Sequence, residues 1–314
     1  MLNRRHLRIK ILLALYAYYS SEERDLPKGE RQLIFSINKF FELYVMLFST
    51  IIALKGYAQN RIEMAKQRLV PTGDDLNPKT RFVDNRFIGQ IEKNSDLHSA
   101  IENFKISWDE EQRAILKNLY EEMLATEIYQ SYMSAENNSY EDDKKFVLAL
   151  FKENICNNER LQGDFEEKSI FWSDDLDLAS SMVIKTLKKV EQTKPLELLP
   201  LYKDHDERMF AIDLYRQAVI TNDENMALIK DKLKNWDEDR LAKMDVLLMK
   251  MALSEAKHFP SIPYKVTMNE YIEISKFYST PDSKKFINGI LDKLFDQLKK
   301  DGGIKKIGRG LLDT

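Results

Sequence analysis

Cysteine is almost absent from this sequence of 314 residues, which contains only Cys156. One cysteine cannot form an intramolecular disulfide or a zinc site made of several thiolates, so we expect the protein to fold in a reducing compartment, the cytoplasm. Glycine and proline are scarce as well, at 10 and 8 residues. Their scarcity leaves few positions for hairpin turns and disfavours a sheet-rich fold.

Neither sign of charge dominates, because 48 Lys and Arg residues stand against 51 Asp and Glu residues. A chain so balanced does not coat nucleic acid over its whole surface, so any basic site must be local. The longest apolar run, Leu43 to Leu54, is shorter than the roughly 20 residues needed to cross a bilayer. We predict a buried core helix there and no association with a membrane.

The four histidines are scattered along the chain, and none lies at a metal-ligand spacing from another histidine, a cysteine or an acid. Acidic pairs such as Glu121-Glu122 fall on helix faces or at helix starts, where solvated charge explains them. We therefore predict no catalytic residue, no metal site and no cofactor.

Helical periodicity is abundant, and the sequence predicts an all-α fold. Apolar residues make up 43% of the chain and charged residues 32%, and apolar residues recur at spacings of three and four. A first helix is expected from Arg4 to Tyr19 and a second, paired or kinked, from Glu30 to Arg68. The stretch from Pro71 to Thr80 is expected to end it, because it carries proline and glycine.

The amino terminus places Arg4, Arg5, Arg8 and Lys10 in the first turns of the first helix. Cations at this end oppose the helix dipole at a cost of about 0.3–1 kcal/mol each. We predict that they contact phosphate groups, which the planar guanidinium group of arginine binds well. Two other interpretations are a solvated face with local acidic partners and an export signal, which the absence of a small-residue cleavage site disfavours.

A second candidate surface lies on the last predicted helix, which Thr280, Pro281 and Asp282 are expected to begin. Asp282, Phe286, Gly289 and Lys293 follow one another at spacings of four, three and four, beside the core-facing stripe. This pattern is typical of a protein-docking ridge. The alternative is that Phe286 and Gly289 pack against the preceding helix, which we expect Asn269 and Glu270 to begin.

Two parts of the chain resemble the NusB family of transcription antitermination factors. One is the terminus NRRHLRIKILLALYAYY, with its arginine-rich start leading to Ala-Leu-Tyr, and the other is Arg240 to Leu294. The matching residues of the second part are Asp245, Leu248, Ala252, Leu253, Glu255, Pro263-Tyr264-Lys265-Val266, Asn269-Glu270, Glu273, Lys276, Asp282-Ser283, Lys285-Phe286, Asn288-Gly289 and Leu291-Asp292-Lys293.

The resemblance implies two small helical bundles that bind boxA-like single-stranded RNA together with NusE, a small-subunit ribosomal protein, within an RNA polymerase antitermination complex. By position, Arg4, Arg5 and Arg8, with Lys10 close by, would contact RNA. Asp245, Asp282 and Phe286, with Lys285, would face NusE. A homodimer is left open.

The middle of the chain has no counterpart in that resemblance. We expect residues 1–20 to form the arginine-rich helix, 21–203 a large helical insertion that partly completes the amino-terminal bundle, 204–300 the carboxy-terminal bundle, and 301–314 a basic flexible tail.

The function expected is antitermination through RNA binding, and the alternative is a helical scaffold that binds only proteins. NusB-like domains also precede RNA cytosine methyltransferases, but this sequence has no glycine-rich cofactor loop.

Overall fold

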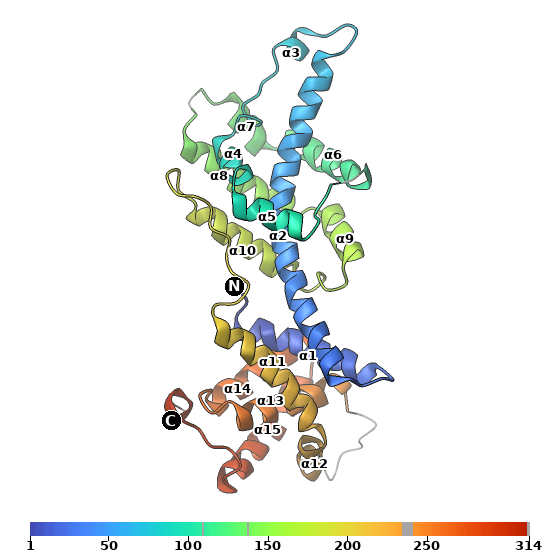
Figure 1. The fold of residues 1–314 in the computed structure, drawn as a ribbon, viewed down its shortest axis with the longest axis vertical. Coiled ribbons are helices and arrows are strands. Elements are labelled where there is room, and N and C mark those ends of the chain that lie inside the picture. Colours follow the sequence, from blue (N-terminus) through green and yellow to red (C-terminus); the bar gives the residue numbers. More distant parts are fainter. Residues whose placement is uncertain (109, 137, 234–240, 313–314) are drawn as a thin grey trace. The chain divides into compact units, whose positions relative to one another are not determined.

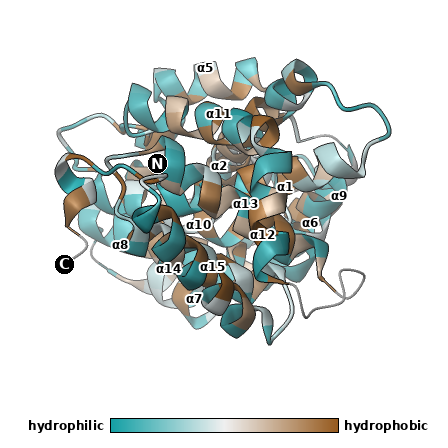
Figure 2. Ribbon diagram, turned by 90° about the horizontal axis from the view of Figure 1, so that it is seen from below, coloured by the Kyte–Doolittle hydropathy of each residue, from teal (hydrophilic) through white to brown (hydrophobic). Residues whose placement is uncertain are grey.

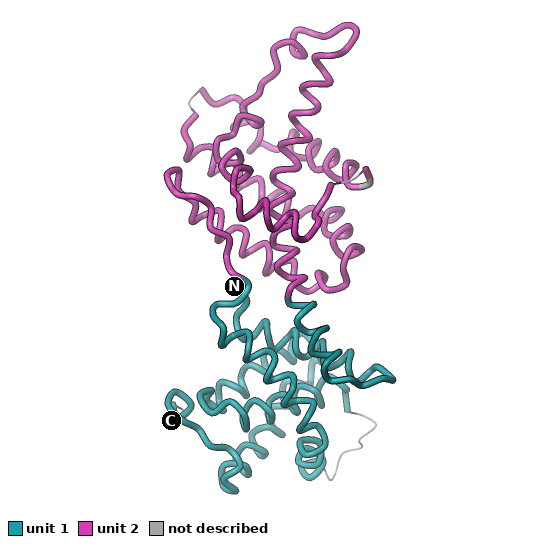
Figure 3. Tube along the Cα trace, in the orientation of Figure 1, with its two compact units in different colours: residues 1–37, 201–314 teal, residues 38–200 magenta. Residues whose placement is uncertain are grey.

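The computed structural model describes residues 1–108, 110–136, 138–233 and 241–312 (Figure 1). Every regular element in these ranges is helical, which confirms the predicted all-α fold. The chain divides into two compact units, one made of residues 1–37 and 201–314 and the other of residues 38–200 (Figure 3). Residues 21–37 thus belong to unit 1 together with the first helix.

Unit 1 is built around helix α13, Lys243–His258, which contacts five other helices. Nearly every residue of α13 between Leu247 and Ala256 is buried, including the charged Glu255. The surrounding helices are α1 (Arg4–Ser20), α11 (His205–Ile220), α12 (Asn222–Lys232), α14 (Tyr264–Tyr278) and α15 (Ser283–Lys300). In Figure 2, α15 carries hydrophobic and hydrophilic residues along its length, as an amphipathic helix should.

Unit 2 contains most of the long helix α2, Leu26–Lys66, which runs without interruption where a pair or a kink was expected. The other elements of this unit are α3 (Gly73–Leu76), α4 (Arg86–Glu92), α5 (Ser95–Asn103), α6 (Glu110–Leu124), α7 (Glu127–Ser134), α8 (Tyr140–Leu150), the π-helix η1 (Phe151–Ile155), α9 (Glu159–Lys168) and α10 (Leu176–Lys189). Ser139 and Asp142 form a capping box at the start of α8, as their spacing suggests.

By length and apolar composition alone, α2 could cross a membrane. However, 67% of its most apolar 18-residue window is buried, and Leu43, Tyr44, Leu47 and Phe48 lie in the core. A core helix of a soluble protein satisfies the same two criteria, so length and composition do not make α2 a membrane span.

Two predicted helix starts are wrong. Helix α14 begins at Tyr264, so Asn269 and Glu270 lie in its second turn and not at its start. Helix α15 begins at Ser283, and the side chain of Asp282 makes no capping hydrogen bond. Instead, the Ser283 hydroxyl accepts a hydrogen bond from the backbone N–H of Thr280 at 3.1 Å.

Candidate functional site

The start of α1 is held in unit 1 by its cap and by a backbone bond. The side chain of Asn3 accepts a hydrogen bond from the backbone N–H of His6 at 3.0 Å, which satisfies one of the unpaired amides of the first turn. The backbone N–H of Leu2 donates to the carbonyl of Leu201 at 3.0 Å. The basic residues therefore leave the helix at a defined place.

Arg8 lies inside unit 1, with 3% of its side chain exposed. Its Nε and Nη2 atoms each lie 2.7 Å from a carboxylate oxygen of Glu255, which is fully buried. Thr267 and Tyr271 also donate hydrogen bonds to this carboxylate, at 2.8 and 3.1 Å. Burial disfavours the charge of Arg8, but the attraction of Glu255 and its hydrogen bonds outweigh burial and raise the pKa of Arg8.

The expectation that Arg8 and Lys10 are presented to solvent is wrong in this structure, because both are buried. The reason for Arg8 lies in the periodicity of α1. Arg8 precedes the buried Leu12 by four residues and Leu15 by seven, so all three share the core-facing stripe. An RNA contact by Arg8 or Lys10 has no support from the geometry.

Arg4 and Arg5 remain accessible, with 38% and 46% of their side chains exposed. The Nε atom of Arg4 bonds Glu207 at 3.1 Å, and its guanidinium carbon lies 4.9 Å from the ring centroid of Phe210. Arg5 bonds Glu270 through Nε and Nη2, at 2.9 and 2.8 Å. Because an arginine side chain carries five N–H groups, each guanidinium keeps donors for a further acceptor while a carboxylate holds it in position.

Glu270 responds to these neighbours. Burial raises the pKa of its carboxyl group, but the hydrogen bond from Arg5 and the charges of Arg8 and Arg5 outweigh burial and lower the pKa. The carboxylate is therefore ionised at neutral pH and orients Arg5 at the rim of unit 1.

A pocket of about 630 Å³ opens beside these residues. It is lined by Arg4, Arg5, Arg8, Glu270 and, from the carboxy-terminal segment, Arg309, together with smaller and apolar side chains. The segment predicted to be a tail therefore places Arg309 and Leu312 beside the start of α1. Four guanidinium groups and one carboxylate at one pocket form a site suited to an anionic ligand.

The four residues predicted to face a protein partner are found in different surroundings. Asp245 is 5% exposed and accepts hydrogen bonds from the hydroxyls of Ser279 and Ser283, so it holds the start of α15. The expectation that Asp245 presents its side chain to a partner is therefore wrong in this structure. Asp282 and Lys285 are exposed, and Phe286 is half-buried.

Gly289 offers a stability test of the same helix. It is exposed in the middle of α15, and a Cβ atom added there meets nothing within 4 Å among the described residues. Gly289→Ala is expected to increase the free energy of unfolding by about 0.5–1 kcal/mol, because glycine loses more backbone entropy in a helix than alanine. Urea unfolding followed by circular dichroism measures this change. Destabilisation would contradict the open space that the structure shows beside Gly289.

The sequence did not predict which carboxylates position the arginines. Glu255 was noted only as part of the family pattern, yet it is the one acid in the apolar stretch from Met249 to Ala256. A lone acid on a buried helix face indicates a buried cation, which in this structure is Arg8. Glu207 carries no comparable signal, because it lies in an acidic first turn that a helix dipole favours anyway.

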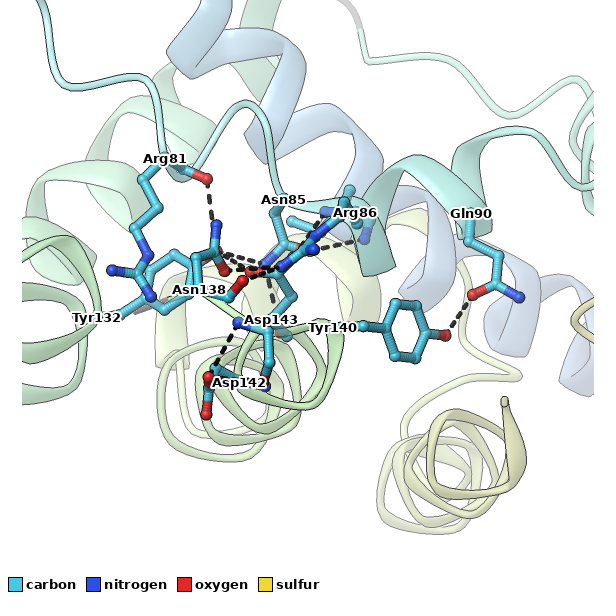
Figure 4. Close-up of polar contacts among 11 residues, drawn as sticks. Arg81, Asn85, Arg86, Gln90, Tyr132, Asn138, Tyr140, Asp142 and Asp143 are labelled. Carbon is cyan, nitrogen blue, oxygen red and sulfur yellow. Dashed lines mark hydrogen bonds and ion pairs between the residues drawn. The ribbon is translucent and has the colours of Figure 1, made fainter. Parts of the chain in front are cut away.

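Unit 2 contains a buried polar cluster that holds several of its helices together (Figure 4). Asp143 is fully buried and accepts hydrogen bonds from the hydroxyl of Tyr132 at 2.7 Å, from Nε of Arg86 at 2.9 Å and from the backbone N–H of Arg86 at 3.1 Å. Asn85 donates to the Tyr132 hydroxyl at 3.0 Å and caps α4. An open pocket of about 780 Å³ lies beside this cluster.

Cys156 follows the π-helix η1 and is partly buried. Burial raises the pKa of its thiol above the ordinary value, so the reactive thiolate is disfavoured at neutral pH. Nucleophilic catalysis of the methyltransferase kind gains no support at this position.

The fold and the site define an all-helical protein whose arginine-rich first helix is bonded to helices from the carboxy-terminal third of the chain. The sequence profile of the NusB family matches residues 177–296. A protein of Salinibacter ruber, named transcription antitermination protein NusB, is 38% identical over 142 residues, which cover 43% of this chain and 89% of that protein. The chain belongs to the NusB family.

Two further relatives bear the same name. The protein of Picosynechococcus sp. is 28% identical over 173 residues, which cover 55% of this chain and 79% of that protein. The protein of Chloroherpeton thalassium is 47% identical over 79 residues, which cover 25% of this chain and 37% of that protein. No solved structure matches the chain with significance.

Proposed function

We propose that this protein is a cytoplasmic transcription antitermination factor that binds boxA-like single-stranded RNA through Arg4 and Arg5, acting with a NusE-like ribosomal protein on RNA polymerase. The observation that carries the proposal is the exposure of both guanidinium groups at a pocket rich in arginine, in a member of the NusB family. The family membership and the names of the relatives support the transcriptional role.

The RNA contact follows from the donors that Arg4 and Arg5 retain. A phosphate oxygen can accept from the N–H groups that Glu207 and Glu270 leave unused, in charge-assisted hydrogen bonds. Phosphate contacts position an RNA but do not read its sequence. Base identity is therefore read elsewhere, and we propose that NusE takes part in it.

Arg5→Ala tests this function. The variant is expected to bind a boxA-like RNA about tenfold more weakly at low salt, because one charge-assisted phosphate contact is lost. The slope of log affinity against log salt is expected to become less steep by about 0.7, the contribution of one phosphate in a single strand. Gel shift or fluorescence anisotropy with and without NusE, over a salt series, measures both quantities.

The matched control is Arg31→Ala, which removes the same charge from an exposed position of α2 in unit 1. Arg8→Ala is unsuitable as a test, because it removes one partner of a buried ion pair. The resulting loss of stability would lower RNA binding even if Arg8 made no contact with RNA. If wild-type protein binds no RNA, the RNA-binding function is rejected, and if the two variants bind RNA equally, the contact by Arg5 is rejected. Absence of RNA binding by the wild type would favour the alternative, a helical scaffold that binds only other proteins.

We further propose that the exposed side of α15, with Asp282, Lys285, Phe286 and Gly289, docks the NusE-like partner. Support comes from the acidic, basic and aromatic side chains on one helix and from the open space at Gly289. Gly289→Leu is expected to keep or improve stability, since leucine is a good helix former, and yet to weaken NusE binding in calorimetry. Unchanged binding would exclude this surface.

A further inference from the structure

The carboxy-terminal segment, residues 303–312, makes hydrogen bonds to the rest of unit 1, whereas the sequence suggested a flexible tail. The backbone N–H of Ile307 donates to the carbonyl of Pro260 at 3.1 Å. The Nζ atom of Lys306 donates to the carbonyls of Ala256 and Phe259, at 2.9 and 3.2 Å. Ile304 is buried. These bonds anchor the segment to the end of α13 and to the loop after it.

Gly310 shows how close this approach is. A Cβ atom at this position lies 2.0 Å from the carbonyl oxygen of Pro260 and 3.2 Å from Cβ of Lys306. Only glycine fits against that backbone oxygen without displacing the segment. Gly308, two residues earlier, has a φ of +52°, a conformation that other residues rarely adopt. The segment is thus shaped to turn against Pro260, and the turn is the short 3₁₀ helix η3, Gly308–Leu311.

The same loop supports the arginines of α1. The ring of Phe259 packs edge-on against Phe210, with centroids 5.1 Å apart. The guanidinium carbons of Arg4 and Arg8 lie 4.9 and 5.3 Å from the centroid of Phe210. The loop therefore contacts the carboxy-terminal segment through Pro260 and the aromatic support of the arginines through Phe259.

Arg309 is the guanidinium group in this pocket that has no acidic partner among the described residues. Arg4, Arg5 and Arg8 are paired with Glu207, Glu270 and Glu255. The side chain of Arg309 is exposed, lines the pocket and makes no hydrogen bond or ion pair within the described part of the chain. Arg4, Arg5 and Arg8 each have a carboxylate partner, so Arg309 is the guanidinium group of the pocket whose charge no carboxylate of the described residues offsets.

We propose that residues 303–312 complete the RNA-binding site and that Arg309 contacts a phosphate of the RNA held by Arg4 and Arg5. This inference rests on the RNA-binding function proposed above and adds to it a segment beyond the region that the family profile matches. The alternative is that the segment covers the pocket and competes with RNA. The two hypotheses predict opposite changes in RNA affinity when the segment is displaced: weaker binding if it contacts RNA, and tighter binding if it covers the pocket.

Two substitutions in the full chain test the inference. Arg309→Ala is expected to weaken binding of a boxA-like RNA about tenfold at low salt and to make the salt slope less steep by about 0.7. Gly310→Val keeps Arg309 but is expected to displace the segment, because the added carbon atoms clash with the Pro260 carbonyl. It is expected to weaken RNA binding to a similar extent.

Lys305→Ala is the matched control, because Lys305 is an exposed cation of the same segment and does not line the pocket. Its RNA affinity is expected to equal that of the wild type. Limited proteolysis measures release of the segment in Gly310→Val, and circular dichroism shows whether α1 and α13–α15 remain folded. Arg5→Ala is measured in the same assay.

Each outcome separates this inference from the proposed function. If Arg5→Ala weakens RNA binding and Arg309→Ala does not, the contact by Arg309 is rejected while RNA binding by α1 stands. If Arg309→Ala or Gly310→Val binds RNA more tightly, the segment is a cover and the inference is overturned. If wild-type protein binds no RNA, both fail together.

Discussion

Glu255→Ala is expected to lower the free energy of unfolding of unit 1 by about 3–5 kcal/mol, the usual cost of removing one partner from a buried ion pair. The substitution leaves the guanidinium group of Arg8 charged and buried, since its side chain is 3% exposed. It also removes the acceptor of the Thr267 and Tyr271 hydroxyls. Urea unfolding monitored by hydrogen exchange in α13 measures the loss.

The control for Glu255→Ala is Arg5→Ala, which breaks the more exposed pair with Glu270. Its expected cost is at most about 1 kcal/mol, because solvent screens exposed pairs and already hydrates their charges. Equal losses for the two variants would contradict the buried position of Arg8. The comparison also separates the two roles of the basic cluster, since Arg5 is expected to affect RNA binding and Arg8 to affect folding.

Asp143→Ala is expected to destabilise unit 2 by about 3 kcal/mol, for a related reason. Asp143 is fully buried and accepts bonds from Tyr132 and from both the side chain and the backbone of Arg86 (Figure 4). Burial raises the pKa of the Tyr132 hydroxyl, and so do the hydrogen bond to Asp143 and the negative charge of its carboxylate. The hydroxyl therefore stays protonated and acts as a donor. Without Asp143, the hydroxyl and the guanidinium group lose their shared acceptor.

Hydrogen exchange of α4 and α8 in a urea series measures the effect of Asp143→Ala. Asp142→Ala is the neighbouring control, because Asp142 is only half-buried and its carboxylate caps the first turn of α8 with Ser139. It is expected to cost much less than Asp143→Ala and to leave α4 protected. A larger effect at Asp142 than at Asp143 would show that the cap, and not the buried cluster, holds this part of unit 2.

The burial of Arg8 was not predicted from the sequence. The basic residues of the first helix were assigned together because they are adjacent in sequence. Their roles differ because a turn of about 100° per residue carries Arg8 to the core side and leaves Arg5 at the surface. The periodicity of Leu12 and Leu15 was sufficient to place Arg8. The partner that makes its burial tolerable, Glu255, is 247 residues away and was not identified as such.

The carboxy-terminal segment gives a second case. The sequence GIKKIGRG has the glycine and the positive charge of a mobile tail. What binds it to unit 1 is a backbone carbonyl, that of Pro260, which accepts from Ile307 and closely faces Gly310. Backbone carbonyls are present at every residue, so no side-chain pattern announces which of them will accept such a bond.

The amino-acid sequence by itself determined the all-helical class, the extent of the first helix, the core position of Leu43 to Leu54 and the family. These properties depend on periodicity and on short motifs, which are local. The tertiary structure alone decided which arginines are buried, which carboxylates orient them and where the last residues lie. Those outcomes depend on contacts between helices remote in the chain, whose relative positions are set by packing of the whole unit.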